Sequence, residues 1–105
     1  MFQRMVCFKY KPETSQEEIA SHLESYSKLP YIVPGIASYK GGLCIPNVDG
    51  ALPEYSSMHY LTFKSLEDMS GYFHHPEHQK FGRLGREISE KIFVLNSEIS
   101  FEATT

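Results

Sequence analysis

Hydrophobic and polar residues alternate along the first ten residues of the chain and along three later segments. Near the N-terminus, Val6 and Phe8 fall on one face of this alternation, together with Arg4, while Met5 and Cys7 fall on the other. A period of two residues is typical of a β-strand. The segments predicted as strands are residues 2–10, 36–42, 56–63 and 91–101.

A helix is predicted between the first two of these strands. Ser15 followed three residues later by Glu18 is the pattern of a capping box, and Thr14 with Glu17 offers a competing register. The helix is expected to end at Leu29 or Pro30, because proline does not continue a helix. The residues that recur at helical spacing and would face the core are Ile19, Leu23, Tyr26 and Leu29, with His22 at the edge of this stripe.

A pair of shorter helices is predicted between the third and fourth strands. Ser65 with Asp68 is typical of a helix start. Pro76 then interrupts the pattern and suits the first position of a new helix, with His75 before it. The expected inward residues are Leu66, Met69 and Phe73 in the first of these helices, flanked by Tyr72, and Phe81, Leu84, Gly85 and Ile88 in the second.

The order strand, helix, strand, strand, helix pair, strand predicts an α+β fold of the ferredoxin-like, split βαβ type. We find no repeat, low-complexity tract or linker, so residues 1–105 are interpreted as one domain. All helices would then lie on one face of a four-stranded, mainly antiparallel sheet. The other face is apolar and has no element left to cover it, so we expect a homodimer in which two sheets pack into a dimeric α/β barrel.

The sequence leaves open which strand face meets the partner. A charged residue at Val6 or Phe8 would either split such a dimer or prevent folding. Residues 44–55 contain two prolines and Asp49-Gly50, so we expect a surface loop there that is more mobile than the flanking strands.

The amino-acid composition limits which binding partners and which cellular compartment we expect. The net charge is −3 and the isoelectric point about 5.9, so neither nucleic acid nor an anionic membrane is an expected partner. We find no secretory signal and no stretch of about 20 apolar residues. Two cysteines, Cys7 and Cys44, make no framework and favour reduced thiols in a cytoplasmic protein, although a disulfide between them stays open at this point.

The densest chemical segment surrounds the predicted break at Pro76. Three of the five histidines lie there, and His78 shares the helical stripe of Phe81, which predicts that it points inward. Tyr72 flanks the inward face of the preceding helix. A neutral imidazole can act as a general base near neutral pH, and a neighbouring phenol can donate a hydrogen bond to an oxyanion.

Two alternatives compete with this interpretation. Both side chains can instead fill the core, with the imidazole bonded to a backbone carbonyl. His74 and His78 have a spacing that can clamp a metal ion, with Glu77 as a third ligand, but Pro76 falls between the two histidines. A solvated helix junction is favoured over a metal site, and no metal or cofactor is expected.

The sequence resembles the stress-responsive dimeric A/B barrel (Dabb) family. The resemblance spans residues 4–95 and includes Phe8-Lys9-Tyr10-Lys11, Pro34-Gly35, and His75-Pro76-Glu77-His78 downstream of Tyr72. It implies a ferredoxin-like protomer and a homodimeric barrel. The family includes a polyketide cyclase whose catalytic tyrosine and histidine match Tyr72 and His78, the histidine acting as base toward a poly-β-keto chain.

This chain departs from that cyclase at two positions. Arg4 and Ser57 stand where the cyclase has histidines, with His59 two residues beyond the second. The resemblance therefore implies a pocket lined by Arg4, Ser57, His59 and Phe81, whose polar groups differ from those of the cyclase.

Competing functions follow from these observations. One is a homodimeric stress-type barrel protein with a pocket between sheet and helices for a small apolar or polyketide-like ligand. Another is a cofactor-independent cyclase, lyase or isomerase that uses Tyr72 and His78 for proton transfer. A cofactor-free monooxygenase is a weaker third, and the absence of tryptophan excludes a Trp-dependent site. A cavity that reaches Tyr72 and His78 would favour the enzyme.

Overall fold

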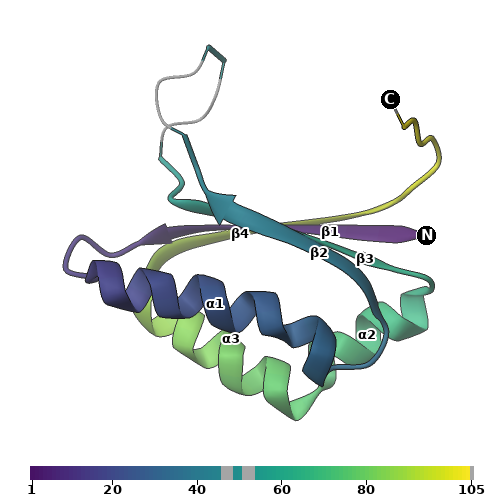
Figure 1. The fold of residues 1–105 in the computed structure, drawn as a ribbon, viewed down its shortest axis with the longest axis horizontal. Helices are drawn as coiled ribbons and strands as arrows, with labels where there is room; N and C mark the ends of the chain where they lie inside the picture. Colours follow the sequence, from purple (N-terminus) through teal and green to yellow (C-terminus); the bar gives the residue numbers. More distant parts are fainter. Residues whose placement is uncertain (46–48, 51–53, 105) are drawn as a thin grey trace.

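The computed structural model describes residues 1–45, 49–50 and 54–104 of the chain. In the described part, the helices and strands follow one another in the predicted order (Figure 1). The elements are β1 (Phe2–Tyr10), α1 (Gln16–Ile32), β2 (Ile36–Leu43), β3 (Ser57–Phe63), α2 (Leu66–His74), α3 (Pro76–Ile88) and β4 (Ser89–Glu98).

The strands form one antiparallel sheet in the order β2-β3-β1-β4. Val6 at the centre of β1 lies opposite His59 of β3 and Val94 of β4. Figure 1 shows α1, α2 and α3 on one side of the sheet and the opposite side uncovered. This is the predicted ferredoxin-like α+β fold.

Strand β4 begins and ends earlier than the predicted segment 91–101. It starts at Ser89, directly after α3, because Ser89 pairs with Tyr10 at the far end of β1. It ends at Glu98 opposite Phe2, and the amide of Ile99 makes one more hydrogen bond to the carbonyl of Met1. Beyond that point β1 has no residues left to pair with.

Helix α1 has the predicted start but extends past its predicted end. Ser15 Oγ accepts a hydrogen bond from Glu18 N, and the Glu18 carboxylate accepts from Ser15 N. The helix continues through Pro30 to Ile32, so the prediction of an end at Leu29 or Pro30 was wrong. Pro30 lies in the last turn, and a missing proline amide removes one helical hydrogen bond there without interrupting a longer run.

The break between α2 and α3 is also as predicted. Ser65 caps α2, and Pro76 is the first residue of α3. His75 is the N-cap of α3, and its Nδ1 accepts a hydrogen bond from Glu77 N at 3.1 Å.

The buried faces of α2 and α3 agree with the predicted stripes at Met69, Phe81 and Gly85 and differ from them elsewhere. Tyr72 is buried against Phe63 of β3, with ring centroids 5.4 Å apart, whereas Leu66 and Phe73 are exposed. Helix α2 is short, and its buried side consists of Met69 and Tyr72 at a spacing of three residues. In α3, Phe81 and Gly85 are buried and Leu84 is exposed.

The core lies between the sheet and the helices. Val6 and Phe8 face the helices and are 4% and 5% exposed, so a charge at either would disrupt the protomer core and would not report on a dimer interface. The other residues of the main apolar cluster are Tyr10, Tyr26, Leu29, Val33, Leu61, Phe63, Met69, Tyr72 and Phe81.

The uncovered sheet face carries the opposite set of strand residues. Met58, Phe93 and Leu95 are 46%, 41% and 53% exposed on this face. Together with Met5 and Cys7 they define what we call the outer face. A groove of about 1,060 Å³ runs over it, lined also by Tyr60, Tyr55, Leu43, Cys44 and Ile45.

Cys7 and Cys44 are both free thiols, so the alternative of a disulfide between them was wrong. Burial raises the pKa of both thiols. A raised pKa keeps a thiol protonated and unreactive at neutral pH.

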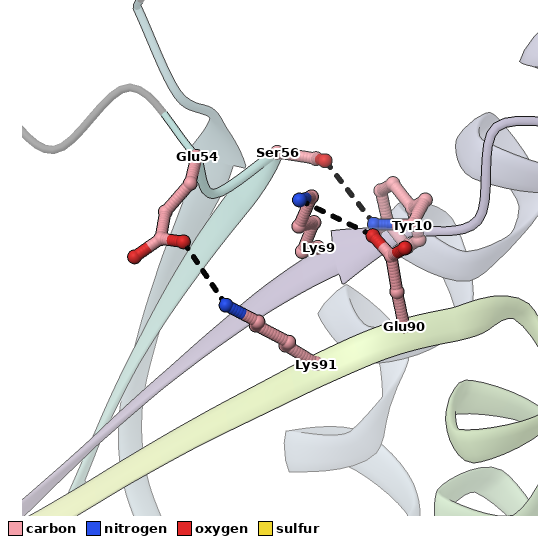
Figure 2. Close-up of polar contacts among 6 residues, drawn as sticks. All are labelled: Lys9, Tyr10, Glu54, Ser56, Glu90 and Lys91. Atoms are coloured by element: carbon pink, nitrogen blue, oxygen red, sulfur yellow. Dashed lines mark hydrogen bonds and ion pairs between the residues drawn. The ribbon is translucent and has the colours of Figure 1, made fainter.

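The predicted loop 44–55 lies partly outside the described residues. Its described members belong to no helix or strand, and its expected mobility stays a prediction. Figure 2 shows how the chain is attached to the sheet after this loop: Ser56 Oγ accepts from Tyr10 N at 3.2 Å, and Glu54 pairs with Lys91 at 3.2 Å. Exposed ion pairs contribute little to stability, so the attachment depends mainly on backbone pairing.

Among the helices that the structure describes, none is both long and apolar enough to cross a membrane.

Candidate functional site

The break at His75–Pro76 brings Tyr72 of α2 and His78 of α3 together. Their ring centroids are 4.3 Å apart at an angle of 48°. Tyr72 is 1% exposed, and its hydroxyl lies beside that of Tyr26 without making a hydrogen bond of good geometry among the described residues. Burial raises the pKa of Tyr72, so the phenol keeps its proton at neutral pH. A buried phenol without a partner can donate a hydrogen bond to a ligand.

The backbone, and not the phenol, orients His78. Its Nδ1 lies 2.9 Å from the carbonyl oxygen of Phe73. Because a carbonyl can only accept, Nδ1 carries the proton of the neutral ring and Nε2 keeps a lone pair. Burial lowers the pKa of His78, and the charge of Arg4 contributes in the same direction. The ring is therefore neutral near pH 7 and able to accept a proton at Nε2.

Arg4 reaches this pair from β1. Its guanidinium carbon lies 5.8 Å from the centre of the Phe73 ring, which in turn is 5.5 Å from the His78 ring. Arg4 Nη1 donates a hydrogen bond to Asn96 Oδ1 on β4 at 3.1 Å. Phe73 is 45% exposed. Tyr72 thus lies beneath a group formed by Arg4, Phe73 and His78.

The other residues expected to line this pocket lie in a second cluster. Ser57 and His59 are fully buried beneath α1, and Phe81 stacks on His22 with ring centroids 5.0 Å apart. Tyr26 stacks on His59 at 4.0 Å. Of the predicted pocket residues, only Arg4 therefore accompanies Tyr72 and His78.

A chain of hydrogen bonds connects this second cluster, which we call the buried network. His22 Nδ1 lies 2.8 Å from Tyr10 Oη, and Tyr10 Oη lies 3.0 Å from Ser57 Oγ. Ser57 Oγ is 3.1 Å from His59 Nε2, and His59 Nδ1 is 2.8 Å from Tyr39 Oη. The sequence analysis did not predict this network, although Tyr10, Ser57 and His59 occupy alternate strand positions whose side chains point toward the helices.

Burial keeps both histidines of the buried network neutral. It lowers the pKa of His22 to about 4 and that of His59 to about 3. His22 Nε2 is buried without a partner in the described part of the chain. The other three ring nitrogens of His22 and His59 are hydrogen-bonded to other side chains. We therefore interpret the buried network as a part of the core that stabilises the fold.

The remaining histidines lie outside both clusters. His74 is exposed near the end of α2, and His75 serves as the helix cap described above. Within residues 1–45, 49–50 and 54–104, no three His, Cys, Asp or Glu side chains gather in a way that could hold a metal ion.

Three clefts are prominent in the described structure, and none of them is lined by Tyr72 or His78. One of about 320 Å³ lies between α1 and α3 and includes His22, Phe81 and Leu84. Another of about 180 Å³ lies beside it, and the third is the groove on the outer face. Because Tyr72 is buried, a ligand can reach its hydroxyl only if neighbouring side chains move.

Gly85 gives the buried network the space that it needs. A Cβ at this position would lie 3.2 Å from His22 Nε2 and 3.3 Å from Phe8 Cε1, both in the core. We expect Gly85→Ala to lower the free energy of unfolding by about 1–3 kcal/mol, because overpacking costs more than the helix propensity gained. Gly82→Ala, in the same helix, meets only the flexible end of Arg86 and should be neutral or stabilising. Urea unfolding of both variants measures the difference, and equal effects would contradict this role of Gly85.

By its fold, the protein belongs to the class of small ferredoxin-like α+β proteins. Its candidate site is a tyrosine and a histidine that lie close together across the break between two helices. The sequence profile of the Stress responsive A/B Barrel Domain (Dabb) family matches residues 2–99. The chain belongs to this family.

Relatives within this fold include enzymes. Olivetolic acid cyclase from Cannabis sativa is 23% identical over 94 residues, which cover 90% of this chain and 92% of the cyclase. Hydroxynitrile lyase from Passiflora edulis is 27% identical, with a TM-score of 0.85 and coverage of 96% of both chains. A dimeric ferredoxin-like protein of unknown function from Thermobifida fusca has a TM-score of 0.78 at 14% identity, over 91% of this chain and 88% of the other.

Proposed function

We propose that this protein is a homodimeric, cofactor-independent enzyme that transfers a proton in a small organic substrate, as a cyclase, lyase or isomerase does. The observation that carries the proposal is the pairing of Tyr72 and His78. A buried phenol without a partner faces an imidazole whose tautomer is set by a backbone carbonyl. The relatedness to a cyclase and to a hydroxynitrile lyase supports the same class of chemistry.

In this proposal His78 is the general base. Nε2 takes a proton from an acidic C–H or O–H group of the substrate, and the resulting imidazolium is stabilised because Nδ1–H already donates to the Phe73 carbonyl. Tyr72 donates its hydroxyl hydrogen to the oxygen on which negative charge develops. The proton on Nε2 is then returned to the product or to its leaving group.

The homodimer is supported by the exposed apolar outer face and by dimeric relatives of the same fold. Met58, Phe93 and Leu95 are each more than 40% exposed in the isolated protomer. Solved structures from Thermobifida fusca and Jannaschia are described as dimeric ferredoxin-like proteins. Packing two outer faces together would bury these side chains and complete a barrel.

Loss of either member of the pair should slow turnover strongly. We expect His78→Ala to lower kcat/KM by about 10²–10⁴-fold, the range of a lost general base, and Tyr72→Phe by about 10²–10³-fold. Suitable assays are cleavage of an aromatic hydroxynitrile and cyclisation of a poly-β-keto thioester. They are chosen because the two relatives are a hydroxynitrile lyase and a cyclase. Because burial lowers the pKa of His78 from its ordinary 6.5, the rate should be constant above that pH and fall only in more acidic solution.

Matched controls exist on the same helices and surface. His74→Ala removes a neighbouring exposed imidazole, and Tyr31→Phe removes an exposed phenol. Both should leave the rate unchanged. Unaltered rates in His78→Ala and Tyr72→Phe would rule out the proposed roles.

A second candidate function is binding of a small apolar ligand without catalysis. The groove on the outer face, lined by Met5, Met58 and Phe93 among others, favours it if a partner protomer does not fill this groove. In this case a fluorescent apolar probe should bind the wild-type protein, binding should depend on Phe93, and His78→Ala should have no effect.

A further inference from the structure

We infer that Arg4 forms an anion subsite beside Tyr72 and His78, which favours substrates that carry a carboxylate group over otherwise similar uncharged ones. This inference rests on the proposed function and names the substrate class of that site. The observation behind it is a guanidinium that lies next to the candidate catalytic pair with a buried, unused donor.

Arg4 has a free donor edge. Nη1 is occupied by Asn96 Oδ1, while Nε is buried and has no hydrogen-bond partner among the described residues. In a guanidinium, Nε–H and one N–H of Nη2 point the same way and match the two oxygens of a carboxylate. Asn96 therefore holds the group by one nitrogen and leaves this edge of the guanidinium for a ligand.

The charge of Arg4 is not neutralised within the described protomer. Its neighbour on β4 is the uncharged Asn96, and Glu98, which follows on the same face of the strand, makes no ion pair with it. A half-buried cation without a carboxylate partner is unfavourable unless water or a ligand anion compensates it. A negatively charged substrate group would supply this compensation at the edge that Asn96 leaves free.

The position of Arg4 relative to the pair sets the substrate's orientation. The Arg4 guanidinium carbon lies 5.8 Å from the centre of the Phe73 ring, and the centre of the His78 ring lies 5.5 Å from the same point. A carboxylate on Arg4 would thus place an adjoining planar or apolar part of the substrate against Phe73, within reach of Tyr72 and His78. Arg4 then positions the substrate, and Tyr72 and His78 act on it.

Binding of benzoate and benzamide tests the inference without any turnover. The two probes have the same shape, but only benzoate is charged. We expect benzoate to shift the NMR signals of Arg4 Nε–H and of the His78 ring in a saturable way, and benzamide to bind at least about tenfold more weakly, since a hydrogen bond to a charged group is worth more than a neutral one.

Two variants test the role of Arg4: one replaces Arg4 itself, and the other changes its neighbour Asn96. Arg4→Gln should weaken benzoate binding at least about tenfold, as expected for a lost charge-assisted hydrogen bond. Asn96→Asp keeps Arg4 but supplies a carboxylate within the protein, and it should weaken benzoate binding as well. Arg83→Gln, which changes an exposed arginine on α3, is the control and should bind like wild type.

The outcomes separate this inference from the proposed function. Equal binding of benzoate and benzamide, or unchanged benzoate binding in both Arg4→Gln and Asn96→Asp, would overturn the anion subsite. His78→Ala should retain benzoate binding while losing turnover, so the catalytic proposal fails on turnover and the subsite fails on binding.

Discussion

Replacing Leu95 by glutamate is expected to convert the protein from dimer to monomer without unfolding it. Leu95 is 53% exposed on the outer face, so its side chain contributes little to the protomer core. In a two-fold barrel the substitution would bury two unpaired carboxylates in the interface. We expect a cost of about 3 kcal/mol or more, which raises the dissociation constant by about a hundredfold.

Leu84→Glu provides a matched control, because Leu84 has the same exposed fraction of 53% but lies on the helical side. Sedimentation velocity over a concentration series distinguishes the two variants, and circular dichroism confirms that both are folded. A monomeric wild-type protein, or a Leu95→Glu variant that dimerises like wild type, would contradict the barrel arrangement.

The protein is expected to lose about 5 kcal/mol of stability between pH 7.5 and pH 4.5 through His22 and His59 alone, since one pKa unit corresponds to about 1.4 kcal/mol for each group. Burial lowers the pKa of His22 from 6.5 to about 4 and that of His59 from 6.5 to about 3. Above pH 6.5 both rings are neutral whether folded or not. Below pH 6.5 the unfolded chain binds protons that the folded chain does not, so the free energy of unfolding falls as the pH is lowered. The contribution of His22 stops falling at about pH 4 and that of His59 at about pH 3, where each ring also takes up a proton in the folded protein.

Urea unfolding at several pH values gives the free energy of unfolding at each pH, and the effect is the slope of this free energy against pH. His22→Asn and His59→Gln keep one hydrogen-bonding group each and should remove about half of the extra slope apiece, even though both lower stability at neutral pH by disturbing the buried network. His74→Asn controls for the loss of an exposed imidazole. A slope that stays the same in His22→Asn and His59→Gln would show that these rings already take up protons in the folded protein.

Much of the fold follows from local patterns. The capping box at Ser15, the cap at Ser65 and the proline start at Pro76 depend on neighbouring residues only, and all were predicted. The end of α1 was not, because whether a helix passes through Pro30 depends on its packing in the last turn. The buried side of α2 was predicted in part: Met69 and Tyr72 are buried as expected, but Leu66 and Phe73 are exposed, since in a helix of nine residues the contact of Tyr72 with Phe63 decides which side is buried.

The candidate site was predictable in part. Tyr72 and His78 lie six positions apart across a recognisable break, so their proximity could be anticipated. The separation of Arg4 from Ser57 and His59 could not, because it depends on the register of β1 against β3, which places Arg4 opposite Leu61. The buried network joins residues up to 47 positions apart, and no local signal links Tyr10 to Ser57.

The hydrogen bond between His78 and the Phe73 carbonyl has a consequence for how the site tolerates change. In an uninterrupted helix this carbonyl would accept from the amide of residue 77, but the break diverts that amide to His75 Nδ1. The acceptor that sets the tautomer of His78 is therefore part of the main chain, which every residue at position 73 supplies. The side chain at position 73 can therefore change without changing the tautomer of the His78 ring.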